Sequence, residues 1–230
     1  MDWKNAYRSL YYADADIPDV QLDPERTALL VIDIQNTYFE RPRNREDVPA
    51  ADMAEWERWQ SFDKRMREVA MPTVRRLQDS FREHGRDVLH ARIACLTADG
   101  RDRSLSQRRP GFNNIMLPKD DYASQIAAQV APAAGEIVVT KTTDSALTGT
   151  NLRLVLQNMG IYHVVVAGIF TDQCVASTVR SLADESFDVV LIEDGCAAIS
   201  KQLHDHELTI INNIYCQVMS ADDVLEILGW

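Results

Sequence analysis

The chain has 230 residues, of which 46% are hydrophobic and 26% are charged, a balance typical of one globular domain of ordinary size. It holds 24 Lys and Arg against 35 Asp and Glu, which gives a formal net charge of -11 at pH 7. A chain this acidic, with no run of basic residues, is not expected to bind nucleic acid.

The four cysteines, Cys95, Cys174, Cys196 and Cys216, lie far apart in the sequence. Their spacing fits neither a disulfide framework nor a Cys-x-x-Cys metal site, so we expect reduced thiols. No apolar stretch approaches the roughly 20 residues that a membrane span requires, and the first residues lack a basic-then-apolar signal pattern. We therefore expect a cytoplasmic protein without a membrane partner.

Short apolar runs rich in Val, Ile and Leu alternate with helical patterns along the chain. Unbroken apolarity indicates strands that are buried on both faces, as in a parallel sheet. In chain order we predict a strand at Thr27–Asp33, a helix at Ser61–His84, a strand at Asp87–Arg92, a helix at Tyr122–Val130, a strand at Glu136–Thr140, a helix at Thr150–Asn158, a strand at His163–Gly168, a helix at Cys174–Glu185, a strand at Asp188–Glu193, a helix at Gln202–Asn213, a strand at Tyr215–Met219 and a helix at Ala221–Leu228. This alternation predicts a doubly wound α/β fold, with a mostly parallel sheet of about six strands and helices on both faces.

Two segments fall outside the alternation. Residues 1–23 contain one tryptophan and three tyrosines without clear periodicity, and we expect an N-terminal arm that packs over the core or over a neighbouring subunit. Residues 40–69 carry fifteen charges of mixed sign, which is typical of a solvated helix. A lid over the site is the alternative for this charged insertion. The main domain is expected to span residues 24–230.

Three reactive side chains fall at the carboxyl ends of predicted strands, where open α/β sheets bind ligands. Asp33 closes the first strand, Lys141 follows the third, and Cys174 follows the fourth in the first turn of a helix. A helix N-terminus has unsatisfied N–H groups and a partial positive charge, which lower a thiol pKa and can hold an oxyanion. Taken singly, the three are typical of a turn cap, a solvated lysine and a small buried residue. Their occurrence at one edge favours a catalytic site.

The segments around these side chains resemble the isochorismatase-like cysteine hydrolases, a family that includes nicotinamidases, N-carbamoylsarcosine amidohydrolases, biuret hydrolases and ureidoacrylate amidohydrolases. The matching motifs are LLVIDIQN at residues 29–36, KTTDSALTGTNL at residues 141–152 and GIFTDQCV at residues 168–175. The likeness extends from about residue 25 to about residue 220.

The resemblance implies a triad, with Asp33 as general base, Lys141 as its electrostatic partner and Cys174 as nucleophile. It also implies that the backbone N–H groups of Phe170 and Cys174 form an oxyanion hole, and that the Ile169–Phe170 peptide bond is cis. The thiolate would attack an amide or ureido carbonyl, release ammonia or an amine, and leave a thioester that water hydrolyses.

Five residues are candidates for substrate binding: Gln35, Tyr38, Phe170, Arg101 and Arg103. Family members often carry an aromatic at the position of Tyr38, where the alternative role is packing under a loop. The two arginines belong to a basic stretch that also holds Arg108 and Arg109. One arginine of this stretch could clamp a substrate carboxylate, and a solvated loop or a subunit contact is the alternative.

No metal and no cofactor is expected. The Asp-x-His metal site of nicotinamidases has no counterpart after the second strand, and His204 and His206 lie in a polar helix where a ligand role is not expected.

We predict a cysteine-dependent amidohydrolase that cleaves a C–N bond of a small amide or ureido substrate, with biuret or a similar ureide as first choice. Isochorismatases themselves cleave a vinyl ether and lack the nucleophilic cysteine, so Cys174 favours amide hydrolysis. The alternatives are an isochorismatase-type or other small-molecule hydrolase, a redox sensor that uses Cys174 as a low-pKa thiol, and a pseudoenzyme that binds a metabolite. The resemblance also implies a homodimer or homotetramer.

Overall fold

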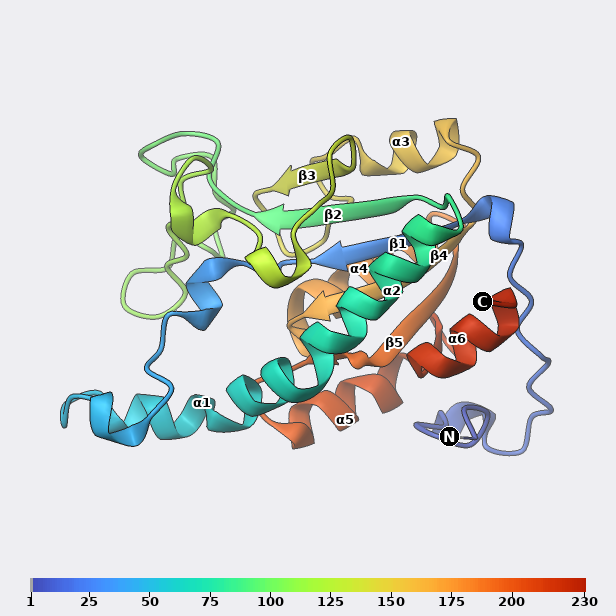
Figure 1. Ribbon diagram of the computed structural model, residues 1–230, viewed down its shortest axis with the longest axis horizontal. Helices are drawn as coiled ribbons and strands as arrows, with labels where there is room; N and C mark the ends of the chain where they lie inside the picture. The colour runs from blue at the N-terminus through green and yellow to red at the C-terminus, as the bar shows by residue number, and fades with distance from the viewer. Residues whose placement is uncertain (1) are drawn as a thin grey trace.

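Six parallel strands form the centre of the computed structural model, which describes residues 2–230 (Figure 1). They are β1 (Thr27–Ile32), β2 (Val88–Ile93), β3 (Ile137–Lys141), β4 (His163–Ile169), β5 (Asp188–Ala197) and β6 (Gln217–Met219). Their order across the sheet is β3-β2-β1-β4-β5-β6, and every neighbouring pair is parallel. The predicted fold class is confirmed, and the sheet is parallel throughout.

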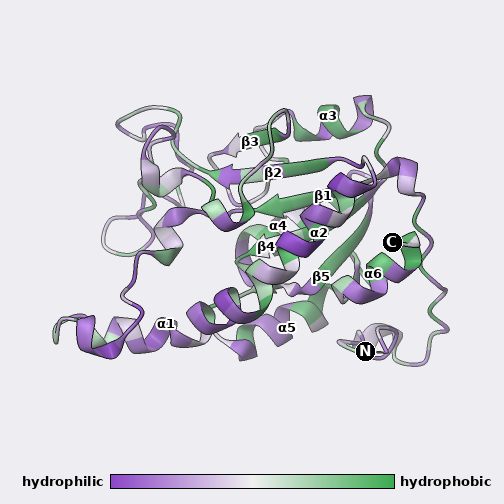
Figure 2. Ribbon diagram, viewed as in Figure 1, coloured by the Kyte–Doolittle hydropathy of each residue, from purple (hydrophilic) through white to green (hydrophobic). Residues whose placement is uncertain are grey.

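The central strands are apolar because both of their faces are covered. Every residue of β1 and of β4 is buried, and Figure 2 shows the strands as predominantly hydrophobic ribbons. One face packs against α2 (Met71–Glu83) and α6 (Ala221–Leu228). The other face packs against α3 (Leu152–Asn158), α4 (Ala176–Asp184) and α5 (Lys201–Ile211). None of the helices within residues 2–230 has the length and apolarity of a membrane span.

Two predicted helices differ from the structure. The helix expected to begin at Ser61 begins at Met53, as α1 (Met53–Arg65), and continues through a π-helical turn (Met66–Ala70) into α2. The helix expected at Tyr122–Val130 is two short 3-10 turns joined by extended residues. Backbone pairing explains this second difference, because Ile126 forms an antiparallel bridge with Gln35. Tertiary hydrogen bonds have overridden local helical preference.

The charged segment 40–69 is only partly helical. Its first part is irregular and contains one short 3-10 turn, and its second part is α1, which extends away from the sheet in Figure 1. Asp63 on α1 is buried and pairs with Arg41 at 2.8 Å, which ties the two parts together. Whether the segment acts as a lid stays a prediction.

The N-terminal arm packs on its own chain. The side-chain amide of Asn212 donates to the backbone oxygens of Ala6 and Tyr7 at 3.1 and 3.0 Å, and Trp3 packs against the core. These contacts place the arm beside the end of α5 and the short strand β6.

A glycine allows β1 and β4 to meet at the edge where the candidate site lies. Gly168 has φ +130°, a backbone conformation that residues other than glycine rarely adopt. A Cβ atom at this position would lie 2.1 Å from the carbonyl oxygen of Ile32, the last residue of β1. The residue must therefore be glycine if the two strands are to run this close.

We expect Gly168→Ala to lower the free energy of unfolding by about 3 kcal/mol or more, since it combines an unfavourable φ with a backbone clash. Gly149→Ala is the matched control, because Gly149 has φ +76° but a Cβ atom added there would meet nothing within 4 Å. The control should lower the free energy of unfolding by only about 1 kcal/mol. Urea unfolding followed by tryptophan fluorescence measures both, and equal losses would contradict the close-approach argument.

Candidate active site

The three predicted triad side chains meet at the carboxyl edge of the sheet. Nζ of Lys141 lies 2.7 Å from Oδ2 of Asp33 and 3.3 Å from Sγ of Cys174. Lys141 is fully buried, and Asp33 and Cys174 are only 2% and 6% exposed. Asp33 follows β1 and Cys174 follows β4, the neighbouring strands at which the strand order reverses. This switch point is where open α/β sheets bind ligands.

Lys141 reaches the site from the edge of the sheet. It is the last residue of β3, and β2 lies between β3 and β1, so its side chain extends past the end of β2. Besides Asp33 and Cys174, its ammonium donates to the carbonyl oxygen of Thr143 at 3.1 Å. An ammonium has three N–H donors, and this buried one has three partners.

Asp33 leaves the strand in an unusual backbone conformation. Its φ is +54°, in the left-handed region that Asp tolerates better than most residues. Its N–H donates to the carbonyl of Ala91 at 2.9 Å, and its own carbonyl accepts from the N–H of Gln35 at 2.8 Å. Such strain, held by hydrogen bonds, is often found at functional sites.

Cys174 lies in the first helical turn after β4, as predicted. That turn, Thr171–Val175, is π-helical and leads into α4. The N–H groups of Gln173 and Val175 both donate to the carbonyl of Phe170, at 3.0 and 3.2 Å. The Ile169–Phe170 peptide bond is cis, as the resemblance implied.

The prediction that the helix N-terminus lowers the pKa of the Cys174 thiol is wrong. Burial raises the pKa of Cys174 well above its usual range, the negative charge of Asp33 adds to the rise, and Lys141 only partly opposes it. The helix N-terminus suggested a stabilised thiolate, but that argument left out the cost of burying the charge. At rest the sulfur is therefore a neutral thiol.

The pKa values of the two residues in the ion pair beside the thiol are also shifted. Burial raises the pKa of Asp33, although Lys141 acts to lower it. Burial acts to lower the pKa of Lys141, but the negative charge of Asp33 and the hydrogen bonds to Asp33 and Cys174 outweigh it and raise that pKa. Lys141 is therefore a cation throughout the physiological range.

The segment after β3 is fixed to the helix that carries the nucleophile. The N–H of Ala146 donates to the hydroxyl of Thr178 at 3.0 Å, and this hydroxyl donates to the carbonyl of Cys174 at 2.7 Å. Ser145 and Ser181 add a second hydrogen bond between hydroxyls at 2.8 Å. The KTTDSA motif is thereby held against the thiol.

This docking brings in a residue that the sequence did not single out. Oδ1 of Asp144 lies 3.8 Å from Sγ of Cys174, and Nε2 of the buried Gln107 donates to the same oxygen at 3.2 Å. Asp144 lies inside a matched motif, but no local pattern indicates that its side chain faces the sulfur. Gln107 lies in a long loop with no periodicity, where its partner could not be predicted.

The two aromatic candidates pack together. The rings of Tyr38 and Phe170 have centroids 5.0 Å apart in an edge-to-face arrangement, and Phe170 also contacts Phe62 and Trp59. Burial raises the pKa of the Tyr38 hydroxyl, as do the charges of the nearby site. Tyr38 therefore lies beside the site, and substrate contact by either ring stays a prediction.

Gln35 makes structural hydrogen bonds, and its contact with a substrate stays a prediction. Its amide nitrogen donates to the carbonyls of Ile93 and Ser124, at 2.9 and 2.8 Å, and its amide oxygen accepts from the N–H of Ile93 at 2.9 Å. Both N–H groups of this buried amide are used. Gln35 therefore links the ends of β1 and β2 to the segment that contains Ser124.

The two candidate arginines lie in the loop after β2. The guanidinium of Arg103 donates to the backbone oxygens of Gly100 and Ile115, at 2.9 and 2.8 Å, and so holds the loop together. Arg101 is exposed and lies near Asp99, at 3.8 Å. The loop contacts the site through Gln107, so the structure places neither arginine against the triad.

His204 belongs to a buried hydrogen-bond network. Its Nδ1 lies 2.8 Å from the hydroxyl of Thr171, and its Nε2 lies 3.0 Å from the guanidinium of Arg65. Arg65 also pairs with Glu193 at 3.3 Å. Both ring nitrogens are occupied, and no three His, Cys, Asp or Glu side chains within residues 2–230 are grouped to hold a metal ion.

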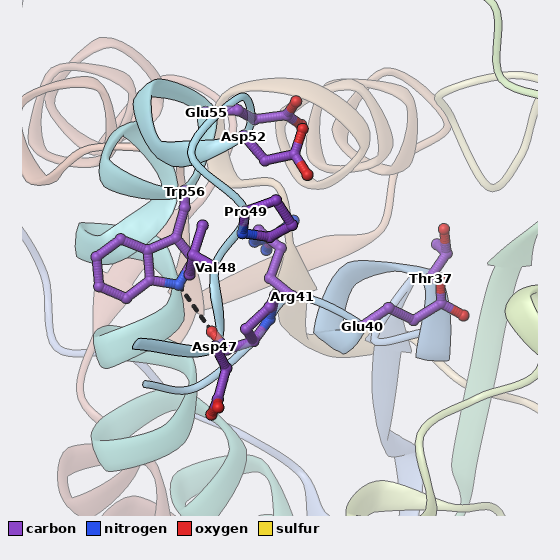
Figure 3. A pocket seen from close by; sticks show the side chains of 10 residues that line it. Thr37, Glu40, Arg41, Asp47, Val48, Pro49, Asp52, Glu55 and Trp56 are labelled. Atoms are coloured by element: carbon purple, nitrogen blue, oxygen red, sulfur yellow. Dashed lines mark hydrogen bonds between the residues drawn. The ribbon is translucent and has the colours of Figure 1, made fainter. Parts of the chain in front are cut away.

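A surface pocket of about 580 Å³ lies next to the charged segment (Figure 3). Figure 3 shows Asp52 and Glu55 on one side, Thr37 and Glu40 on the other, and Arg41 between them. None of the triad side chains lines this pocket. All of its lining residues except Thr37 belong to the charged segment 40–69.

Several known proteins are similar to this chain in sequence and in fold. The family model of the isochorismatase domain matches residues 27–223. An N-carbamoylsarcosine amidase from an Arthrobacter species is 30% identical over 166 residues, which cover 70% of this chain and 62% of that amidase. The ureidoacrylate amidohydrolase RutB of Pantoea ananatis is 27% identical, over 74% of this chain and 69% of that enzyme. A solved isochorismatase family protein from Burkholderia thailandensis has a TM-score of 0.72 at 26% identity, with 94% of this chain and 100% of that one covered.

We expect Asp33→Asn to lower the pKa that governs the alkylation of Cys174 by iodoacetamide by about 0.5 or more, because the charge that raises the thiol pKa is gone. The midpoint of the rate against pH should move to lower pH. Asp184→Asn, which removes an exposed charge on α4, is the control and should leave the profile unchanged. Mass spectrometry of the Cys174 peptide gives the rate at each pH, and a midpoint that stays in place or moves to higher pH in Asp33→Asn would contradict the charge assignment.

Proposed function

Because this chain belongs to the isochorismatase family, and because its Asp33, Lys141 and Cys174 side chains are in contact, we propose that it is a cysteine amidohydrolase. The observation that carries the proposal is the buried ammonium of Lys141, which touches both a carboxylate and a thiol. An acyl-transfer reaction needs a base, here the carboxylate of Asp33, close to its nucleophile. The substrate is a small amide or ureide, and the bond cleaved is C–N.

The first step is proton transfer coupled to attack. Because the thiol of Cys174 is neutral at rest, Asp33 must accept its proton as the sulfur approaches the carbonyl carbon. Lys141 stays in place and stabilises the negative charge wherever it lies, first on the carboxylate and then on the sulfur. The raised pKa of Asp33 makes it a stronger base than an ordinary aspartate.

The later steps reuse the same groups. The tetrahedral oxyanion is held by the backbone N–H groups of Phe170 and Cys174, where the chain turns from β4 into helix. Asp33, now protonated, gives its proton to the departing nitrogen, and the C–N bond breaks to leave a thioester on Cys174. Asp33 then takes a proton from water, which hydrolyses the thioester.

The substrate class is argued from the relatives and from the thiol. Two of the relatives act, by their names, on a carbamoyl compound and on a ureido compound, which favours a small ureide. Biuret is our first choice within this class. A redox sensor needs an accessible thiol with a low pKa. Burial and a raised pKa of Cys174 weigh against that alternative.

We expect Cys174→Ala to abolish ammonia release from a panel of biuret, monosubstituted ureas, carbamoyl amino acids and simple amides, since no acyl-enzyme can form. Cys95→Ala is the matched control, because Cys95 is also buried and, within residues 2–230, forms no hydrogen bond with a triad side chain. Asp33→Asn should lower turnover by ~10²-fold. An active Cys174→Ala protein, or an acyl adduct mapped to another cysteine, would rule out the proposed nucleophile.

Treatment with EDTA followed by desalting should leave ammonia release within about twofold of the untreated rate, because the proposed mechanism routes no step through a metal ion. Zinc and manganese are then added back to the desalted protein. A loss on chelation that either ion restores would show that the reaction depends on a metal.

A further inference from the structure

Asp144 is a charged group beside the reacting sulfur that the proposed mechanism does not use. One of its oxygens, Oδ1, lies 3.8 Å from Sγ of Cys174 and accepts from Gln107 at 3.2 Å. No hydrogen bond from residues 2–230 reaches its other oxygen, Oδ2, and this atom is not one of the buried side-chain oxygens that lack a partner. The carboxylate is therefore fixed at one oxygen and open at the other.

The charge of Asp144 is not compensated locally. Asp33 and Lys141 are in contact at 2.7 Å and largely cancel one another at a distance. Within the described chain, Asp144 takes part in no salt bridge, and its charge adds to the rise in the pKa of Cys174. A substrate that approaches the thiol therefore meets a net negative charge.

Geometry places the substrate next to this carboxylate. In a productive complex the attacked carbon lies within about 3.5 Å of the sulfur, and so within about 7 Å of Oδ1 of Asp144. The substituents on that carbon reach closer still. Charges at this separation still interact appreciably near a protein surface, where the effective dielectric constant is about 20.

We infer that Asp144 selects substrates by their charge. Its open oxygen accepts an N–H of the substrate, and its negative charge favours uncharged or cationic ureides and amides over those that carry a carboxylate. This inference rests on the proposed amidohydrolase function and narrows its substrate class. Among the arginines of the loop after β2, Arg103 is bonded to its own loop, Arg101 is exposed beside Asp99, and Arg108 donates to the carbonyl of Arg101 at 3.5 Å.

The first test uses two alkylating reagents and needs no substrate. Iodoacetate and iodoacetamide attack the same sulfur but differ by one negative charge, so the ratio of their rates at Cys174 reports the local potential. We expect Asp144→Asn to raise the iodoacetate-to-iodoacetamide ratio by about tenfold. Asp184→Asn removes the same charge from the surface and should leave the ratio within about twofold. Because the ratio is taken within each variant, a general change in thiol reactivity cancels.

The second test uses three ureas of similar size: N-propylurea, the cationic N-(2-aminoethyl)urea and the anionic N-carbamoylglycine. We expect the wild type to hydrolyse the first two with kcat/KM at least about tenfold above the third. In Asp144→Asn and Asp144→Ser this preference should fall below about threefold, mainly through faster hydrolysis of the anion. Thermal unfolding of each variant checks that the fold is retained.

The outcomes separate the two proposals. An unchanged reagent ratio in Asp144→Asn overturns the inference, as does an equal loss of kcat/KM for all three ureas, which is the result for a base or a structural residue. A changed reagent ratio with no hydrolysis of any urea by the wild type supports the placement of Asp144 and counts against the proposed hydrolysis of ureides.

Discussion

The buried ion pair between Asp33 and Lys141 is the constraint on which the candidate site depends. Removing a carboxylate and an ammonium from water costs several kcal/mol per ion, and breaking such a pair leaves an uncompensated charge worth about 3–5 kcal/mol. The fold meets this cost with geometry: Lys141 has a partner for each of its three N–H donors, and Asp33 is held in a left-handed conformation by two backbone hydrogen bonds. A pair that costly to bury is expected where its charges act on a reaction rather than on stability.

The pair also sets how the thiol can react. A base takes a proton most effectively when its pKa approaches that of the acid, and burial raises the pKa of Asp33 toward that of a thiol. The pKa of Cys174 rises as well, so a free thiolate is disfavoured until an electrophile is bound. Lys141 then stabilises the anion on either atom without moving. The site is thus arranged for proton transfer during attack, which protects the idle thiol from side reactions.

Residues at strand ends could be predicted from the sequence, and residues placed by loop packing could not. Asp33, Lys141 and Cys174 follow unbroken apolar runs, and parallel strands bring such positions to one edge. Asp144 and Gln107 meet through contacts between two irregular segments, for which no periodicity exists. Gln35 lay in a matched motif, yet its role depends on carbonyls from two distant segments. The prediction for the thiol pKa was wrong because local helix polarity could be read from the sequence whereas burial could not.

The network behind the nucleophile shows how the remote charged segment bears on the site. Arginine can only donate, so Nε2 of His204 accepts from Arg65, and the ring proton must lie on Nδ1 and point to the hydroxyl of Thr171. Burial, with the charge of Arg65, lowers the pKa of His204 to about 3, so this tautomer persists from acidic to alkaline conditions. Thr171 begins the turn that carries Cys174, and Arg65 ends α1. The charged helix therefore holds the nucleophile turn through a contact that does not titrate, which leaves the pH response of the reaction to the triad itself.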